Sequence, residues 1–260
     1  MSMSRTVVAA MAHPDDIEFL CAGTLRLLVE CGWTLRCVTL SGGDIGAPAG
    51  SRETIRATRL REAGRAAAIL GGAYHWAGLD DLTIQYCADQ LRAVTDALRA
   101  CGPDLVITHS PDCYMVDHEE TSRLVRMACF AAGMPLFETT HRATGKPVPA
   151  LYYADAFEGK NKFGEPVIAE FWVDVDSVFE TRQAALACYA SQRTWLRAHH
   201  GVDNYLALSE SFARLHGQRC GLRLAEGFRQ HLGHGYPQEN ILAASLAAFV
   251  KSRSTDAPRA

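Results

Sequence analysis

The chain has 260 residues, 48% of them hydrophobic, and a formal net charge of −3 at pH 7. This composition supports a stable core without disulfides or a structural metal, and the small negative charge without basic blocks argues against nucleic-acid binding. No apolar run approaches the ~20 residues that span a membrane, and the first residues lack a signal-peptide profile. We therefore expect one domain over residues 1–251 and a disordered tail over residues 252–260.

Apolar runs and helical spacing alternate along the first half of the chain. The pattern predicts a strand over residues 5–11, a helix ending at Glu30, a strand over 34–40, helices over 53–70 and 88–100, a strand over 104–108 and a helix over 119–131. Such alternation implies right-handed crossovers and a parallel sheet.

The second half is expected to complete the sheet and cover it. Strands over residues 150–154 and 167–173, joined by a turn over 159–164, predict an antiparallel edge, and helices are expected over 177–195, 206–217 and 241–250. The predicted fold class is α/β: a three-layer α/β/α, Rossmann-like arrangement with a mostly parallel sheet and an antiparallel edge.

The nine cysteines are scattered and include no C-x-x-C pair. An odd number of cysteines on predicted helices and strands indicates reduced, packed thiols. We expect a cytoplasmic protein.

Residues 12–18, Ala-His-Pro-Asp-Asp-Ile-Glu, join the first strand to the first helix. Pro14 suits the first turn of a helix and biases His13 towards extended geometry. His13 and Asp16 can then converge on one point as two ligands of a zinc ion, and Asp15 faces the same opening. The structural alternative is an N-capping turn, because an aspartate near a helix N-terminus satisfies free N–H groups.

A second polar cluster, residues 109–119, also follows a predicted buried strand. Open α/β sheets bind ligands at the carboxyl ends of their parallel strands. We therefore expect His118 to join His13 and Asp16 on the same ion. Asp117 is expected to hold the ring of His118, because metal-bound imidazoles usually have a hydrogen-bonding partner.

The Ala-His-Pro-Asp-Asp motif, followed much later by Asp-His, resembles the LmbE-like or PIG-L-like zinc-dependent deacetylases. Members of this family remove acetyl groups from N-acetylglucosamine units in sugars, thiol conjugates and glycolipids. Weaker matches follow in the family's order: the loop Thr39–Gly46, the Arg-x-x-Glu of Arg59–Glu62, the turn Gly78–Asp81, the pair Ser191–Gln192 and the segment Leu224–Phe228.

The resemblance implies that His13, Asp16 and His118 bind zinc and that Asp15 is the general base for the zinc-bound water. Attack on the amide would release acetate and a free amino sugar. The chemistry agrees independently, since zinc on two histidines and one carboxylate lowers the pKa of water towards ~7. Iron or another divalent ion is an alternative to zinc, because this set of ligands has little selectivity among such metals.

In the functional interpretation Arg59 reaches a hydroxyl or phosphate group of the substrate, and the resemblance implies that Asp44 and Asp81 accept hydrogen bonds from sugar hydroxyls. The structural alternatives are a solvated helix pair for Arg59 with Glu62 and ordinary turn chemistry for the two aspartates. The rim of the site is expected from the loops over residues 43–51, 133–149 and 194–205.

Two positions depart from the family pattern. Met115 stands where a histidine commonly assists the tetrahedral intermediate, and methionine cannot donate a proton. Tyr114 is the candidate to replace that donor. Tyr189 stands where many members have a histidine before the Ser-Gln pair, and its phenol could donate to an oxyanion. We therefore include both tyrosines among the expected substrate-binding residues.

Three functional hypotheses follow. The first is a zinc-dependent N-deacetylase that acts on a small N-acetylated amino sugar or its conjugate. The second is an amidase that cleaves a larger acyl group. The third is a catalytically silent sugar-binding or metal-sensing protein, prompted by Met115 and Tyr189, against which the retained Asp15 argues. The expected partner is a small amino-sugar substrate, without nucleic acid or membrane, and the resemblance is compatible with a homotrimer or homohexamer.

Overall fold

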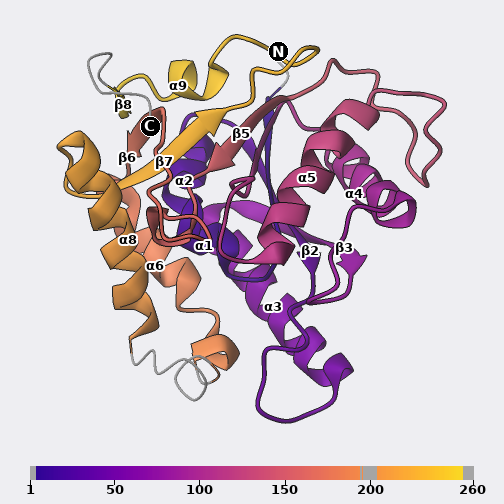
Figure 1. The fold of residues 1–260 in the computed structure, drawn as a ribbon, viewed down its shortest axis with the longest axis horizontal. Helices are drawn as coiled ribbons and strands as arrows, with labels where there is room; N and C mark the ends of the chain where they lie inside the picture. Colours follow the sequence, from indigo (N-terminus) through magenta and orange to yellow (C-terminus); the bar gives the residue numbers. More distant parts are fainter. Residues whose placement is uncertain (1–3, 194, 196–203, 254–260) are drawn as a thin grey trace.

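The structure is a computed structural model that describes residues 4–193, 195 and 204–253. Its eight described strands form one sheet in the order β3-β2-β1-β4-β5-β7-β6-β8 (Figure 1). Strands β3 to β5 in this order pair in parallel, and β7, β6 and β8 continue the sheet in antiparallel pairing. Their bounds are β1 Thr6–Met11, β2 Thr34–Ser41, β3 Gly72–Leu79, β4 Leu105–Thr108, β5 Ala150–Ala154, β6 Phe171–Asp174, β7 Ala225–Gln230 and β8 Val250–Ser252.

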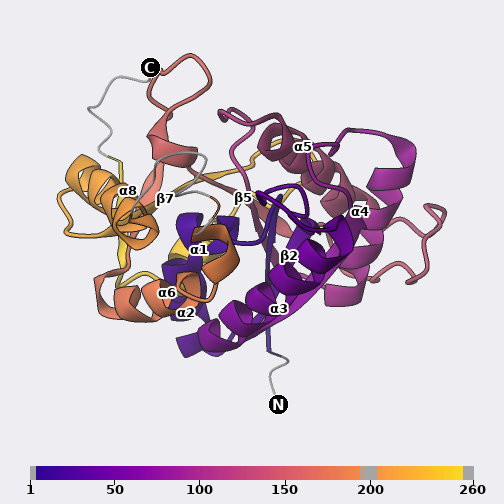
Figure 2. The same cartoon turned by 90° about the horizontal axis from the view of Figure 1, so that it is seen from below.

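Helices cover both faces of the sheet. Figure 2 shows α4 and α5 on one side and α2, α3 and α6 on the other, so the predicted three-layer α/β/α class is confirmed. Within the described residues, no helix has the length and apolar character needed to cross a membrane. The bounds are α1 Asp16–Leu20, α2 Ala22–Glu30, α3 Arg52–Leu70, α4 Ala88–Cys101, α5 Val116–Ala131, α6 Phe179–Leu186, α8 Tyr205–Cys220 and α9 Ile241–Ser245, with short 3-10 turns η1 Phe157–Gly159 and η2 Asp176–Val178.

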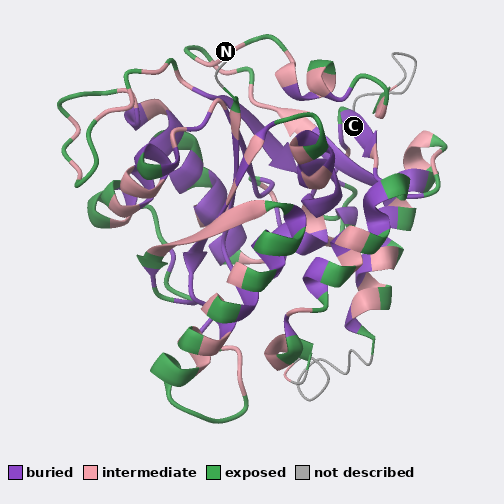
Figure 3. Ribbon diagram, turned by 180° about the vertical axis from the view of Figure 1, so that it is seen from behind, coloured by how far each residue is buried: buried purple, intermediate pink, exposed green. Residues whose placement is uncertain are grey.

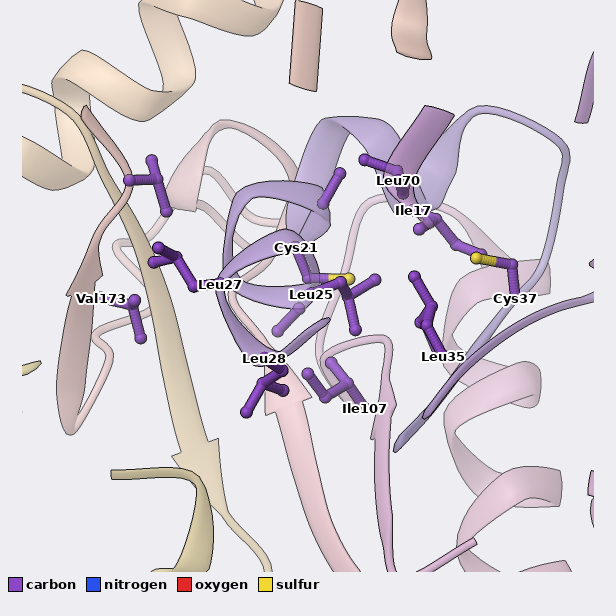
Figure 4. Close-up of a cluster of buried hydrophobic side chains, with 14 of the residues drawn as sticks. Ile17, Cys21, Leu25, Leu27, Leu28, Leu35, Cys37, Leu70, Ile107 and Val173 are labelled. Carbon is purple, nitrogen blue, oxygen red and sulfur yellow. The ribbon is translucent and has the colours of Figure 1, made fainter. Parts of the chain in front are cut away.

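Strand β1 lies near the middle of the sheet and is buried on both faces. Val7 and Ala9 join the core beneath α2 and α3, whereas Val8 packs beneath α4 and α5. Figure 4 shows Leu25 and Leu28 of α2 packed against the sheet, in the core that lies beneath α2 and α3. In Figure 3 most strands are buried, edge strand β3 is of intermediate burial, and the outer helices alternate between buried and exposed positions.

Three strands, β3, β7 and β8, were not predicted, and they change the edges of the sheet. Strand β3 has a glycine near each end and is mostly half-buried, so it lacks the strong apolar pattern of a central strand. Strand β7 lies between β5 and β6, which therefore do not pair with each other as expected. The antiparallel part of the sheet is confirmed, but its pairing was wrong.

Several helix boundaries also differ from the prediction: α5 begins at Val116 and not at residue 119, and α8 ends at Cys220 and not at residue 217. The first helix is divided at Cys21, whose φ of −151° is non-helical. The predicted helix over residues 177–195 is interrupted at 187–189, and the last one ends at Ser245. Ser252, placed in the disordered tail, belongs to β8, while residues 254–260 of that tail lie outside the described residues.

Glu226 of β7 fixes the start of helix α2. Its carboxylate accepts hydrogen bonds from the backbone N–H groups of Gly23, at 2.9 Å, and Thr24, at 2.7 Å. Arg182 of α6 faces the same carboxylate, with Nε 3.2 Å from Oε1, and its Nη2 donates to the carbonyl of Phe19 at 2.7 Å. Because both side chains are buried, this ion pair ties β7, α6 and α1 together.

We expect Arg182→Met to destabilise the fold by about 3–5 kcal/mol, because it leaves the Glu226 carboxylate buried without its cation. Urea unfolding measures the loss. The matched control is Arg214→Met, since Arg214 pairs with Glu210 on the surface and should contribute less than about 1 kcal/mol. Equal losses in both variants would contradict the assignment.

Candidate metal centre

The parallel pairing of β1 with β4 brings the two predicted motifs together. The register aligns Ala10 with Thr108, so the two strands end at the same edge of the sheet. Immediately beyond them, the N–H of Ala12 donates to Nε2 of His109 at 3.0 Å. Helices α1 and α5 begin at this edge: Asp16 is the first residue of α1, His118 lies in the first turn of α5, and His13 lies in the turn before α1.

His13, Asp16 and His118 converge as the spacing predicted. Each offers a ligand atom, and these atoms all lie within 4.8 Å of one another. Asp16 stands between the rings, with Oδ2 3.3 Å from Nδ1 of His13 and Oδ1 3.5 Å from Nε2 of His118. All three residues are buried. The simple N-capping alternative is wrong for Asp15, because it makes no side-chain cap hydrogen bond.

The protonation of His118 and Asp16 suits a divalent cation. Burial lowers the pKa of His118 well below its ordinary value, so its imidazole is neutral, as a ligand must be. Burial alone would raise the pKa of Asp16, but its contacts with the surrounding histidines, including hydrogen bonds with His109 and His13, hold it well below the usual range. Two imidazoles and one carboxylate are a donor set for zinc or for iron. The residues present therefore fit the metal that the resemblance implies.

Hydrogen bonds on the far side of His13 orient its ring. Nε2 lies 3.1 Å from Oδ2 of Asp117 and 3.2 Å from Oδ1 of Asp81, so an N–H at Nε2 leaves Nδ1 facing Asp16. These bonds raise the pKa of His13 against the opposing effect of burial. The expectation for Asp117 is corrected here: it supports a ligand ring, but that ring belongs to His13 and not to His118.

The His118 ring is held by other groups. Its Nδ1 lies 3.3 Å from Sγ of Cys113, and it stacks on the ring of His109, with centroids 4.0 Å apart and planes inclined by 8°. Cys113 is buried, and burial raises the pKa of its thiol. The thiol is therefore a neutral neighbour that can accept the Nδ1–H when Nε2 faces the cation.

Asp15 sits beside the cluster in a strained backbone conformation. Its φ of 100° lies in the left-handed region, which costs a non-glycine residue about 1–3 kcal/mol. The carboxyl is buried, and its Oδ2 accepts a hydrogen bond from the hydroxyl of Tyr205 and lies 3.9 Å from Nη2 of Arg59. Burial raises the pKa of Asp15 to about 7, although Arg59 opposes the shift.

The cluster opens into a cavity of about 560 Å³. One wall is aromatic: the ring centroid of Phe19 lies 5.1 Å from that of Phe157 and 4.9 Å from that of Tyr205. Polar side chains, including Arg59 and Gln192, line other parts of it. The cavity therefore has more volume and more apolar surface than a single bound metal ion would need.

Three of the expected substrate-binding residues line this cavity: Arg59, Asp81 and Tyr114. Arg59 is buried, and its Nη1 donates to the carbonyl of Gly43 at 2.6 Å. The solvated-pair alternative is wrong, because Glu62 is also buried and accepts the hydroxyl hydrogen of Ser191 at 2.5 Å.

Two expected substrate-binding residues do not reach the cavity. The buried carboxylate of Asp44 pairs with Arg52 and Arg56, and the arginine side chains hold its pKa below the usual range against the effect of burial. Tyr189 lies in the core, where its hydroxyl donates to Oε2 of Glu18 at 3.1 Å. Both assignments are therefore corrected, because these polar groups are already bound within the protein.

Several lining residues were missed. Phe19 carried no sequence signal, because an aromatic residue in a helix is usually core, and Phe157 and Glu158 follow β5 in a segment not expected at the rim. Tyr205 was expected only as the last residue of a rim loop, and its contact with Asp15 was not predicted. Of the predicted rim loops, residues 45, 46, 195 and 205 line the cavity, while residues 194 and 196–203 lie outside the described residues. The loop over 133–149 instead packs against α4 through Arg99.

A family model described as PIG-L: GlcNAc-PI de-N-acetylase matches residues 8–129, the part of the chain that holds both motifs. The matched part therefore includes most of β1, all of β4 and the residues that form the buried cluster, so the chain resembles this family where the cluster lies. The predicted resemblance to the LmbE-like and PIG-L-like family is confirmed.

The chain is similar to proteins whose names refer to two different reactions, deacetylation and hydration. It is 26% identical over 239 residues, 86% of this chain and 82% of the relative, to diacetylchitobiose deacetylase of Thermococcus kodakarensis. It is 25% identical over 196 residues, 72% of this chain and 74% of the relative, to 4-oxalmesaconate hydratase of Pseudomonas putida. The solved structure of N,N'-diacetylchitobiose deacetylase from Pyrococcus horikoshii aligns with a TM-score of 0.74 at 21% identity, covering 92% of this chain and 89% of that one, which supports the fold.

Zinc at 100 times its Kd should raise the unfolding free energy by about 2.7 kcal/mol, because it binds only the folded cluster. His118→Ala should abolish this stabilisation. His141→Ala is the control, since His141 is exposed and pairs with Asp96 away from the cluster. Thermal unfolding with and without zinc measures the effect, and undiminished stabilisation of the His118 variant would contradict the ligand assignment.

The left-handed backbone of Asp15 predicts an order among its variants. Asp15→Gly should be more stable than Asp15→Ala by about 1 kcal/mol or more, because both lose the carboxyl but only glycine relieves the strain. Urea unfolding of the two variants without metal provides the measurement. A more stable alanine variant would show that the φ of 100° is not the native conformation.

Proposed function

We propose that this protein is a metal-dependent N-deacetylase that removes an acetyl group from an N-acetylglucosamine-type amino sugar or its conjugate. The observation that carries the proposal is the position of Asp15, a buried carboxyl that lines the cavity beside the cluster of His13, Asp16 and His118. The PIG-L match and the similarity to a diacetylchitobiose deacetylase support it. A silent binding protein would need no carboxyl held in a strained backbone at this place.

His13, Asp16 and His118 would hold the metal, and we propose zinc as the native ion, with Fe²⁺ as the alternative. When bound there, such an ion lowers the pKa of water and polarises a carbonyl oxygen. Asp117 and Asp81 keep the His13 ring in place through Nε2, and Cys113 meets the far side of the His118 ring.

Asp15 performs both proton transfers in the proposed reaction. It accepts a proton from the attacking water while a carbon–oxygen bond forms at the amide carbon. It then donates that proton to the nitrogen as the carbon–nitrogen bond breaks. The products are acetate and a free amine, and Asp15 returns to its starting state.

The charges of the cavity favour an uncharged, hydroxyl-bearing substrate. Among the described lining residues, Arg59 is the one arginine or lysine, and its guanidinium already donates to Gly43. Carboxyl groups are more numerous there: Asp15, Asp16, Asp81 and Glu158. An acetamido sugar adds no negative charge to this lining, and its ring can pack on the aromatic wall.

Hydration of a carboxylate-bearing substrate is the second candidate function. The 25% identity to a hydratase named for 4-oxalmesaconate and the absence of a donor at Met115 favour it. The shortage of cations in the described lining argues against it. The two functions share Asp15 and the metal cluster, so only product analysis separates them.

The cellular setting is also part of the proposal. The nine cysteines are free, which suits a reducing cytoplasm. A homotrimer or homohexamer is the assembly that the family resemblance implies, and the substrate is the one small-molecule partner that we propose.

The test is acetate release from N-acetylglucosamine and its glycosides by zinc-loaded protein. Asp15→Asn should lower kcat by about 10²- to 10⁴-fold, because it removes the group that moves the proton. Glu53→Gln is the control, since this exposed residue on α3 lies outside the cavity lining. A longer N-acyl series identifies an amidase, and turnover of an unsaturated carboxylate without amide hydrolysis would replace deacetylation by hydration.

A further inference from the structure

Tyr205 reaches the proposed site from a distant part of the chain. It is the first residue of α8, it is buried, and its hydroxyl donates to Oδ2 of Asp15. It also lines the cavity. Neither the motifs nor the comparisons assign it a role.

We propose that Tyr205 is a positioning residue for the reaction: its hydroxyl holds the Asp15 carboxyl in the orientation from which it accepts the proton of the attacking water. This inference rests on the proposed function. Its physical basis is the contact between a buried phenol and the carboxyl that moves the proton.

Among the described residues, two neighbours of the Asp15 carboxyl lie on the same oxygen. The Tyr205 hydroxyl and Nη2 of Arg59 face Oδ2, which leaves Oδ1 as the oxygen that accepts the proton. Asp15 needs such an anchor because its side chain makes no bond to the helix it precedes. Rotation about its side-chain bonds would otherwise turn the wrong oxygen towards the water.

The position of the Tyr205 side chain is set by the packing around it. The Tyr205 ring meets Phe19 edge to face, with centroids 4.9 Å apart and planes inclined by 72°. Asn204 caps α8 by accepting the N–H of Ala207 at 3.1 Å, and Phe212 packs further along the helix into the core. The position of the hydroxyl is therefore set by the docking of α8 and not by the flexible end of a long side chain.

The chain supplies a matched control in Tyr189. It too is buried, and its hydroxyl also donates to a buried carboxyl, that of Glu18, but it does not line the cavity. Removing the hydroxyl of either tyrosine costs a buried hydrogen bond of the same kind. Only the loss at Tyr205 should disturb the orientation of Asp15.

The experiment compares Tyr205→Phe with Tyr189→Phe in zinc-loaded protein. Tyr205→Phe should lower kcat for an N-acetylglucosamine derivative by about 10- to 100-fold, with KM changed by less than about threefold, because misplacing a catalytic group slows the chemical step. Tyr189→Phe should change kcat by less than about threefold. In the Asp15→Ala background, Tyr205→Phe should cause no further fall, because the group through which it acts is gone.

A crystal structure of Tyr205→Phe provides a readout that does not depend on activity. The Asp15 carboxyl should be rotated or disordered there, while His13, Asp16 and His118 keep their places. An unmoved Asp15, or equal losses of kcat in both tyrosine variants, would overturn the inference. If the wild type releases no acetate, the proposed function fails, and the position of Asp15 in the variant still decides whether Tyr205 holds it.

Discussion

The proposed site depends on the parallel pairing of β1 with β4. Their register brings the turn with His13 and Asp16 next to the segment that leads to His118. The hydrogen bond from Ala12 to His109 ties the two segments just beyond the strands, and the stacking of His109 on His118 carries that constraint to a ligand ring. The pairing of the strands thus sets the positions of the proposed metal-binding residues, and ligand sites are common at the carboxyl edge of open α/β sheets.

Placing these groups together concentrates charge in a poorly solvated space. Asp15, Asp16, Asp81 and Asp117 are all buried at this edge, with Arg59 as the nearby buried arginine. Hydrogen bonds to the histidines and to backbone N–H groups compensate part of that charge. A divalent cation would compensate more, so metal binding and stability should be linked in this protein. The same balance also disfavours substrates that bring further negative charge.

The sequence was most informative where local chemistry and strand order act together. The turn after β1 could be predicted because proline, histidine and aspartate have strong local preferences there, whereas α5 begins at Val116, three residues before the predicted start. Partners set by tertiary packing could not be predicted. Asp117 was expected on the wrong imidazole, because residues adjacent in a helix point in different directions. Tyr205 was expected only at the end of a rim loop, and its bond to Asp15 was missed because nothing near it in the chain indicates which helix face meets Asp15.

The two departures from the family pattern, Tyr189 and Met115, have different consequences, because Met115 lines the cavity and Tyr189 does not. Tyr189 bonds Glu18 in the core, so its change does not alter the groups that meet a substrate. Met115 does line the cavity and removes a proton donor from it. Amide hydrolysis nevertheless takes one proton from water and delivers one to the amine, so a single carboxyl can serve both steps. A chain that keeps Asp15 and anchors it therefore retains a complete path for the proton.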